Sequence, residues 1–95
     1  MPLRKLVLDV LKPLRGLGIE EMALALESLE GVEKVEIVVK EFDVDTVTLI
    51  VTLEGEAIDF ESVKESLEKL GAVIHGVDQV IAARSTERSR RHRSE

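Results

Sequence analysis

The sequence contains no cysteine, and this absence removes three classes of chemistry at once. Without a thiol there is no disulfide, no thiolate-bound metal ion and no cysteine nucleophile. Tryptophan and tyrosine are also absent, so that Phe42 and Phe60 are the only aromatic residues. The hydrophobic core must therefore be built from valine, leucine and isoleucine.

Long hydrophobic runs are missing as well. The apolar stretches have the length of strands and are interrupted by charged residues, so neither a transmembrane segment nor a signal peptide is predicted. We therefore expect a cytoplasmic protein. Asparagine is absent and Gln79 is the only glutamine, whereas Glu, Lys and Arg are abundant. Such a composition resembles that of heat-adapted proteins.

The length of 95 residues and the 44% hydrophobic content predict one small globular domain. A domain of this size buries a smaller share of its surface than a larger one, which makes association a natural supplement to its core. The net charge of -6 is unevenly distributed, because five arginines and two glutamates lie in residues 84–95. We expect an acidic domain over residues 1–83 and a basic, disordered tail over residues 84–95.

Hydrophobic periodicity predicts four strands and two helices. Alternation with period two indicates strands, and apolar residues at helical spacing indicate helices. The predicted elements are a strand over 3–13, a helix over 19–29, a strand over 32–42, a strand over 47–53 that ends at residues 54–56, a helix between the Asp59 cap and Gly71, and a strand over 72–83. The alternation of the last strand breaks around Gly76, which predicts a bulge or a bend there.

The order β-α-β-β-α-β with right-handed crossovers predicts an α+β ferredoxin-like sandwich, with an antiparallel sheet in the order 4-1-3-2 and both helices on one face. The other face of this sheet would have no cover from its own chain. Five apolar side chains are predicted on this uncovered face: Val7, Leu11, Val38, Phe42 and Ile50. A contiguous patch of them would require a partner. We expect a homo-oligomer that uses this face or a sheet edge; the alternative is a monomer with scattered apolar groups.

Leu24 does not belong to the apolar stripe of its helix and is predicted to point away from the core. It is either an ordinary exposed leucine or part of a subunit contact.

Asp9 lies in the middle of the first strand, and His75 is its candidate neighbour on the last strand. A carboxylate and an imidazole together can bind a metal ion or move a proton. The alternative is that Asp9 pairs with Lys5 or Lys12 and that His75 is a half-buried polar residue.

Glu41, Asp43 and Asp45 cluster at the turn between the second and third strands, with an Asp-x-Asp spacing that hard cations such as calcium favour. The Asp-Gly pair and the twelfth-position glutamate of an EF-hand are missing. The cluster is therefore either a solvated turn or, together with Asp9, part of a divalent-cation site that a second subunit completes.

No residue constellation predicts catalysis. The Gly16-Leu17-Gly18 stretch lacks the third glycine and the lysine of a phosphate-binding loop, and the helical serines have no histidine at a suitable position. RNA-binding sheets of similar architecture use aromatic and basic residues. Here the uncovered face offers only Phe42 and the domain is acidic, so the arginine-rich tail is the remaining candidate for binding nucleic acid. The alternative for the tail is a solvated chain end.

Several segments resemble, in order and spacing, an archaeal family of uncharacterised proteins catalogued as domain of unknown function 211. The matching segments cover residues 3 to about 83 and are residues 6–13, 31–32, the hairpin through 53–55, 58–61 and 70–78. The resemblance implies a ferredoxin-like fold, an archaeal cytoplasmic source and a homo-oligomer, such as a ring, without implying an activity. The polar residues at matching positions that we would test first are Asp9, Lys12, His75 and Asp78.

Two features depart from the family pattern. The loop after Pro13 lacks an expected histidine, which argues against a shared metal site, and the arginine-rich tail runs past the usual end. The resulting hypothesis is a non-enzymatic oligomeric domain that binds a small ligand or a divalent cation at acidic positions near subunit contacts. The alternative is a nucleic-acid-associated protein that acts through its tail.

Overall fold

The computed structural model describes residues 2–84. Its elements, in chain order, are β1 (Leu3–Pro13), α1 (Ile19–Glu27), β2 (Lys34–Phe42), β3 (Thr46–Ile58), α2 (Phe60–Lys69) and β4 (Val73–Ala82). The number, type and order of the elements are as predicted from the periodicity. The tail expected over residues 84–95 lies, apart from Arg84, outside the described residues.

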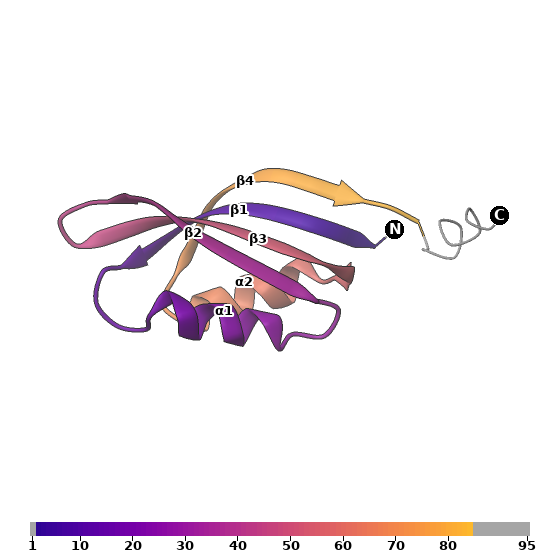
Figure 1. Cartoon of the computed structure of the whole chain (residues 1–95), viewed down its shortest axis with the longest axis horizontal. Helices are drawn as coiled ribbons and strands as arrows, with labels where there is room; N and C mark the ends of the chain where they lie inside the picture. The colour runs from indigo at the N-terminus through magenta and orange to yellow at the C-terminus, as the bar shows by residue number, and fades with distance from the viewer. Residues whose placement is uncertain (1, 85–95) are drawn as a thin grey trace.

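The four strands form one antiparallel sheet in the order β2-β3-β1-β4. This confirms the predicted order 4-1-3-2, with β1 and β3 inside the sheet and β2 and β4 at its edges. Figure 1 shows both helices on one side of the sheet, below it in this view. The opposite side of the sheet is uncovered within residues 2–84, and this makes it a candidate surface for a functional site.

The core lies between the sheet and the helices. Leu6, Leu8 and Val10 of β1 are buried at alternate positions, as the period-two pattern predicts. They pack in one cluster with buried residues of the other elements: Met22, Leu26, Val32, Val47, Leu49, Val51, Leu53, Ile58, Val63, Leu67 and Ala72. Burial of one such aliphatic side chain contributes about 1.5–3 kcal/mol, so this cluster is the main stabilising feature of the domain.

Strand β3 is longer than the sequence predicted. The prediction ended it at residues 54–56, whereas the strand continues to Ile58 and pairs again with β1 at Leu3. The strand is irregular here because Gly55 passes close to Gly31, where a Cβ atom on either glycine would collide with a backbone carbonyl oxygen. Glycine in this segment therefore allows a close backbone approach, where the prediction took it for a strand end.

Helix α1 ends at Glu27, before the predicted end at Leu29. The backbone N–H of Leu29 donates to Leu26 O at 3.2 Å, and that of Val32 donates to Leu29 O at 3.1 Å. These tighter hydrogen bonds replace the helical pattern and lead the chain to Gly31, which has a φ of 89°. Gly31 thus closes the turn after the helix, as predicted.

The prediction for Phe42 was wrong. The register between β2 and β3 shifts between Val39 and Glu41, so Lys40 is an extra residue in β2. As a result Glu41 lies opposite Thr48 on the uncovered side, whereas Phe42 lies opposite the buried Val47 on the helix side. Phe42 is nevertheless 66% exposed. A bulge of one residue reverses the side of every later residue in a strand, and the alternation alone did not reveal it.

Candidate functional site

The candidate site is the uncovered side of the sheet, which we call the open sheet face. Residues directly opposite each other in antiparallel strands point to the same side, so the registers define its members. They are Lys34, Glu36, Val38 and Glu41 of β2, Thr46, Thr48, Ile50, Thr52 and Glu54 of β3, Lys5, Val7, Asp9, Leu11 and Pro13 of β1, and Val73, Gly76, Gln79 and Ile81 of β4.

Apolar side chains occupy much of this face. Val7, Leu11 and Ile50 are half-buried, whereas Val38 and Val73 are exposed. Four of the five apolar residues predicted for this face therefore lie on it: Val7, Leu11, Val38 and Ile50. Val73 and Ile81 were missed, because irregularities in β4 hide its alternation.

Charged residues of both signs surround the apolar ones. At one end of the face, Lys34, Glu54 and Lys5 lie next to one another in one row across β2, β3 and β1. Glu36 and Glu41 lie on the edge strand β2. The face therefore combines an apolar centre with charges of both signs, which is the usual composition of a protein interface.

Asp9 is the polar residue within the apolar centre. Its cross-strand neighbours are Ile50 and Gly76, and Val7 and Leu11 flank it along β1. Its Oδ1 is the only buried side-chain nitrogen or oxygen atom in residues 2–84 that has no hydrogen-bond partner. An unpaired buried polar atom costs about 1–3 kcal/mol and more when it carries charge. Residues 2–84 supply no donor to this oxygen.

Gly76 leaves free space beside Asp9. A Cβ atom at this glycine would meet no heavy atom within 4 Å. Along the row that contains Val38, Ile50 and Asp9, the face is therefore hollow at β4. An approaching group can reach the Asp9 side chain, which is only half-buried as a whole, from this direction.

The predicted pair of Asp9 and His75 is not formed directly. The register between β1 and β4 shifts at two places, which leaves His75 and Asp78 as extra residues of β4. Gly76, not His75, lies opposite Asp9, and no hydrogen bond joins Asp9 to His75 within the described residues. The bulge expected around Gly76 is present at the adjacent His75. Both His75 and Asp78 are exposed.

Lys12 lies on the other side of the sheet. It is opposite Val47, is only 5% exposed, and its Nζ donates to Pro13 O at 2.8 Å. It therefore does not pair with Asp9. Lys5 shares the open sheet face with Asp9, but no ion pair joins the two within residues 2–84. The four polar residues singled out from the sequence, Asp9, Lys12, His75 and Asp78, do not form one site.

The acidic turn makes hydrogen bonds within the chain. Asp43 Oδ1 accepts the N–H of Val44 at 2.8 Å, and the carbonyl of Asp45 accepts the N–H of Leu14 at 3.0 Å. No group of three or more histidine or carboxylate side chains suited to a metal ion occurs in the described range 2–84. The predicted cation site of Glu41, Asp43, Asp45 and Asp9 is therefore not assembled within one subunit. Its completion by a second subunit stays a prediction.

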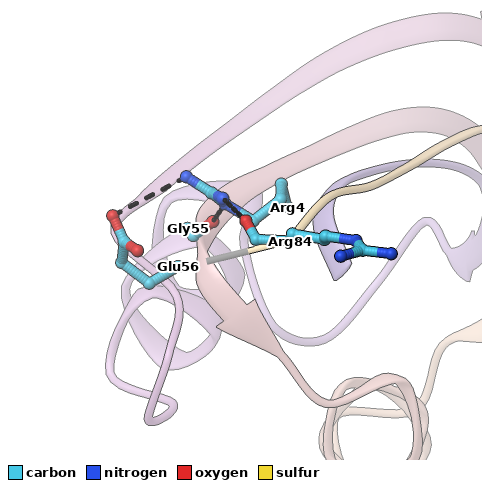
Figure 2. A network of polar contacts seen from close by, with 4 residues as sticks. All are labelled: Arg4, Gly55, Glu56 and Arg84. Carbon is cyan, nitrogen blue, oxygen red and sulfur yellow. Dashed lines mark hydrogen bonds and ion pairs between the residues drawn. The ribbon is translucent and has the colours of Figure 1, made fainter. Parts of the chain in front are cut away.

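Arg4 forms a polar network that sequence reasoning missed (Figure 2). Its Nε donates to Gly55 O at 3.3 Å, its Nη1 donates to Arg84 O at 3.2 Å, and its Nη2 lies 3.8 Å from Glu56 Oε2. The partners come from β3 and from the chain segment after β4. Arg4 lies where the registers of both neighbouring strands shift, so it joins three segments at the point where the ladder is irregular.

Two further predicted features concern the surface. Leu24 of α1 is 68% exposed, as predicted, and whether it makes a subunit contact stays untested. No helix in residues 2–84 has both the length and the apolar character needed to cross a membrane.

Comparison with known proteins supports the resemblance found in the sequence. The family model of domain of unknown function 211, described as "Uncharacterized ArCR", matches residues 4–94. An uncharacterised protein of the archaeon Methanocaldococcus jannaschii is 43% identical over 82 residues, which are 86% of this chain and 84% of that protein. Neither description names a ligand, an activity or an assembly.

Proposed function

The chain belongs to the family of domain of unknown function 211, and on this premise we propose that it is a non-enzymatic, ferredoxin-like domain that assembles into a homo-oligomer through its open sheet face. The observation that carries the proposal is the apolar centre of this face, in which Asp9 has a buried oxygen without a partner. A face of this kind is completed by a partner that covers it.

The dimensions of the face suit a pair of subunits. Strand β1 has 11 residues, and four strands of this length cover about 37 Å by 19 Å, or roughly 700 Å². Standard protein interfaces bury about 800 Å² per partner. The face is therefore close to the size that a specific contact between two copies needs.

The charges of the face also suit a second copy. Lys5 and Lys34 lie on it together with carboxylates such as Asp9 and Glu54. Where a surface that pairs with itself carries charges, both signs are favourable, because each contact brings together two regions of the same patch. A polyanion would instead meet carboxylates at the centre of the face and along β2.

Substitution at Val38 tests this proposal. Val38→Lys places a charge on an apolar, 50% exposed position of the open sheet face without disturbing the core. Val44→Lys is the matched control, since Val44 is 88% exposed in the turn between β2 and β3. Light scattering coupled to size exclusion should give an oligomer for the wild type and the control, and a smaller species for Val38→Lys. An oligomer of unchanged size in Val38→Lys contradicts the use of this face.

A divalent cation such as calcium at the subunit contacts is the second part of the proposal. Glu41 lies on the open sheet face near the end of β2, and Asp43 is the first residue after this strand. Carboxylates from two subunits would together supply the oxygen ligands that such a cation prefers. Calorimetric titration of the metal-depleted oligomer with calcium tests this part. Binding that persists in the double variant Glu41→Gln, Asp43→Asn would exclude these ligands.

A further inference from the structure

We propose that two open sheet faces pair about a two-fold axis beside Val7, so that Lys5 of each copy binds Asp9 of the other. This inference rests on the proposed self-association and specifies its geometry. It is carried by the unpartnered Asp9 Oδ1, the free space at Gly76 and the register that connects them to Lys5 and Ile81.

The surroundings of Asp9 define the group that it can receive. Apolar side chains flank the carboxylate on three sides: Val7, Leu11 and Ile50. An ammonium group on a flexible hydrocarbon stem fits such a place, because the stem contacts the apolar side chains while the charge meets the carboxylate. The carboxylate shares one charge between its two oxygens, so a cation that approaches from the open side compensates the group as a whole.

Lys5 of a second copy is in the correct position to supply this ammonium group. It lies on the same face of β1 as Asp9, four residues away, which corresponds to about 13 Å along the strand. Val7 lies midway between the two. A two-fold axis that runs between the packed sheets, across the strands and past Val7, places each Lys5 over the Asp9 of the other copy. Both ion pairs then form together.

The same axis fills the hollow at Gly76. Ile81 is the cross-strand neighbour of Lys5, and Gly76 is the cross-strand neighbour of Asp9. The operation that brings Lys5 over Asp9 therefore also brings the 41% exposed Ile81 over the bare backbone of Gly76. A large apolar side chain thus meets the one position of the face that lacks a side chain.

Other two-fold axes fit less well. An axis along β1 would set Lys5 against Lys5 and Asp9 against Asp9, and like charges in contact are unfavourable. An axis between β1 and β3 would pair Lys5 with Glu54 but leave Asp9 facing Ile50. The proposed axis brings the two Glu36 residues toward each other on the edge strand β2 and sets Glu54 opposite Ile50, but it is the one of these three axes that gives Asp9 a cation as its partner.

Charge exchange tests the pairing. Lys5→Asp and Asp9→Lys should each weaken the association at least tenfold, because each creates a pair of like charges in the interface. The double variant Lys5→Asp, Asp9→Lys restores opposite charges and should recover most of the affinity, measured by sedimentation at several concentrations. If the double variant associates no better than the single variants, the pairing is wrong.

Gentler substitutions guard against a failure to fold. Asp9→Asn and Lys5→Gln keep the size of the side chains, and circular dichroism checks that the variants are folded. If the pair forms, the loss of affinity in the double variant is smaller than the product of the losses in the single variants. If both substitutions leave the affinity unchanged while Val38→Lys abolishes association, the open sheet face is confirmed as the interface and the proposed pairing is refuted. A monomeric wild type refutes both proposals.

A cross-link tests the axis independently. Because the natural sequence has no cysteine, Val7→Cys introduces a single thiol next to the axis. A short bismaleimide should join two copies of this variant, since facing sheets pack about 10 Å apart. Val44→Cys is the matched control and should give no comparable product. Equal cross-linking of the two variants would contradict the axis.

Discussion

At the scale of single residues, Asp9 is the most informative feature, because its Oδ1 is buried and has no hydrogen-bond partner within residues 2–84. Its cross-strand neighbour Gly76 lacks a side chain, and this matters for the proposed contact as much as the side chains that are present. Its Cβ position faces free space, and its φ lies outside the positive range. The subunit therefore tolerates a side chain there, whereas the proposed contact does not.

Gly76→Val separates the two effects. Valine favours strands more than glycine does, so we expect the stability of the isolated subunit to be unchanged or slightly higher. The association should weaken at least tenfold, because the new side chain occupies the space proposed for Ile81 of the second copy. Urea denaturation and sedimentation measure the two quantities on one sample. A variant that associates as tightly as the wild type would show that the hollow stays empty in the assembly.

Arg4 provides a second prediction at this scale. Its side chain is 23% exposed, donates hydrogen bonds to two backbone carbonyls and forms an ion pair with one carboxylate. Arg4→Met keeps much of the stem but removes these donors, and it should lower the free energy of unfolding by about 1–2 kcal/mol. The matched substitution Arg15→Met at an exposed loop position should change it by less than about 0.5 kcal/mol. Chemical denaturation monitored by circular dichroism measures the free energy of unfolding of both variants. Equal losses would show that the Arg4 network does not contribute to stability.

At the scale of elements, the passage of β3 past the turn after α1 explains why this end of the domain is irregular. The backbone of residues 55–57 lies against Gly31, and Glu33 N donates to Glu54 O at 2.8 Å. Beyond its predicted end, β3 carries two of the three acceptors of Arg4, the carbonyl of Gly55 and the carboxylate of Glu56. Glycine at this crossing is therefore needed for space as well as for conformation.

Two glycine variants distinguish space from conformation. Gly31 and Gly71 both have positive φ values, of 89° and 85°, but only Gly31 has a backbone carbonyl oxygen where a Cβ atom would lie. Gly71→Ala should cost about 1 kcal/mol from backbone strain alone. Gly31→Ala adds a collision with Ala57 O and should cost clearly more, about 3 kcal/mol or above. Thermal unfolding of the two variants side by side measures the difference, and similar values would mean that β3 shifts to make room.

Which elements the sequence predicts depends on how regular they are. Strand β1 was predicted correctly because Leu6, Leu8 and Val10 alternate without interruption on its core side. Apolar residues of β2 lie on both sides of the sheet, so the alternation gave no sign of the bulge at Lys40. The predicted side of Phe42 was wrong as a result. The bulges of β4 were foreseen only near Gly76, where the alternation visibly breaks.

The whole molecule determines the parts of the site that the sequence could not show. Arg4 and its partners Gly55 and Arg84 are separated by 51 and 80 residues, and two of its acceptors are backbone carbonyls, which no sequence pattern marks. Asp9 has no charged or polar cross-strand neighbour, and this follows from the register of three strands together. The sequence predicted the residues of the open sheet face in outline, but their neighbours required the assembled sheet.

At the scale of the whole molecule the central proposal is self-association, because a small domain buries a smaller share of its surface than a larger one and this one leaves a partly apolar sheet face uncovered within residues 2–84. The most direct test is the native mass of the full chain, measured by mass spectrometry at micromolar concentration before and after treatment with EDTA. We predict a discrete oligomer, and a loss of mass or dissociation with EDTA if cations lie at the contacts. A monomer under both conditions would contradict self-association, and the open sheet face would then have to serve a different partner.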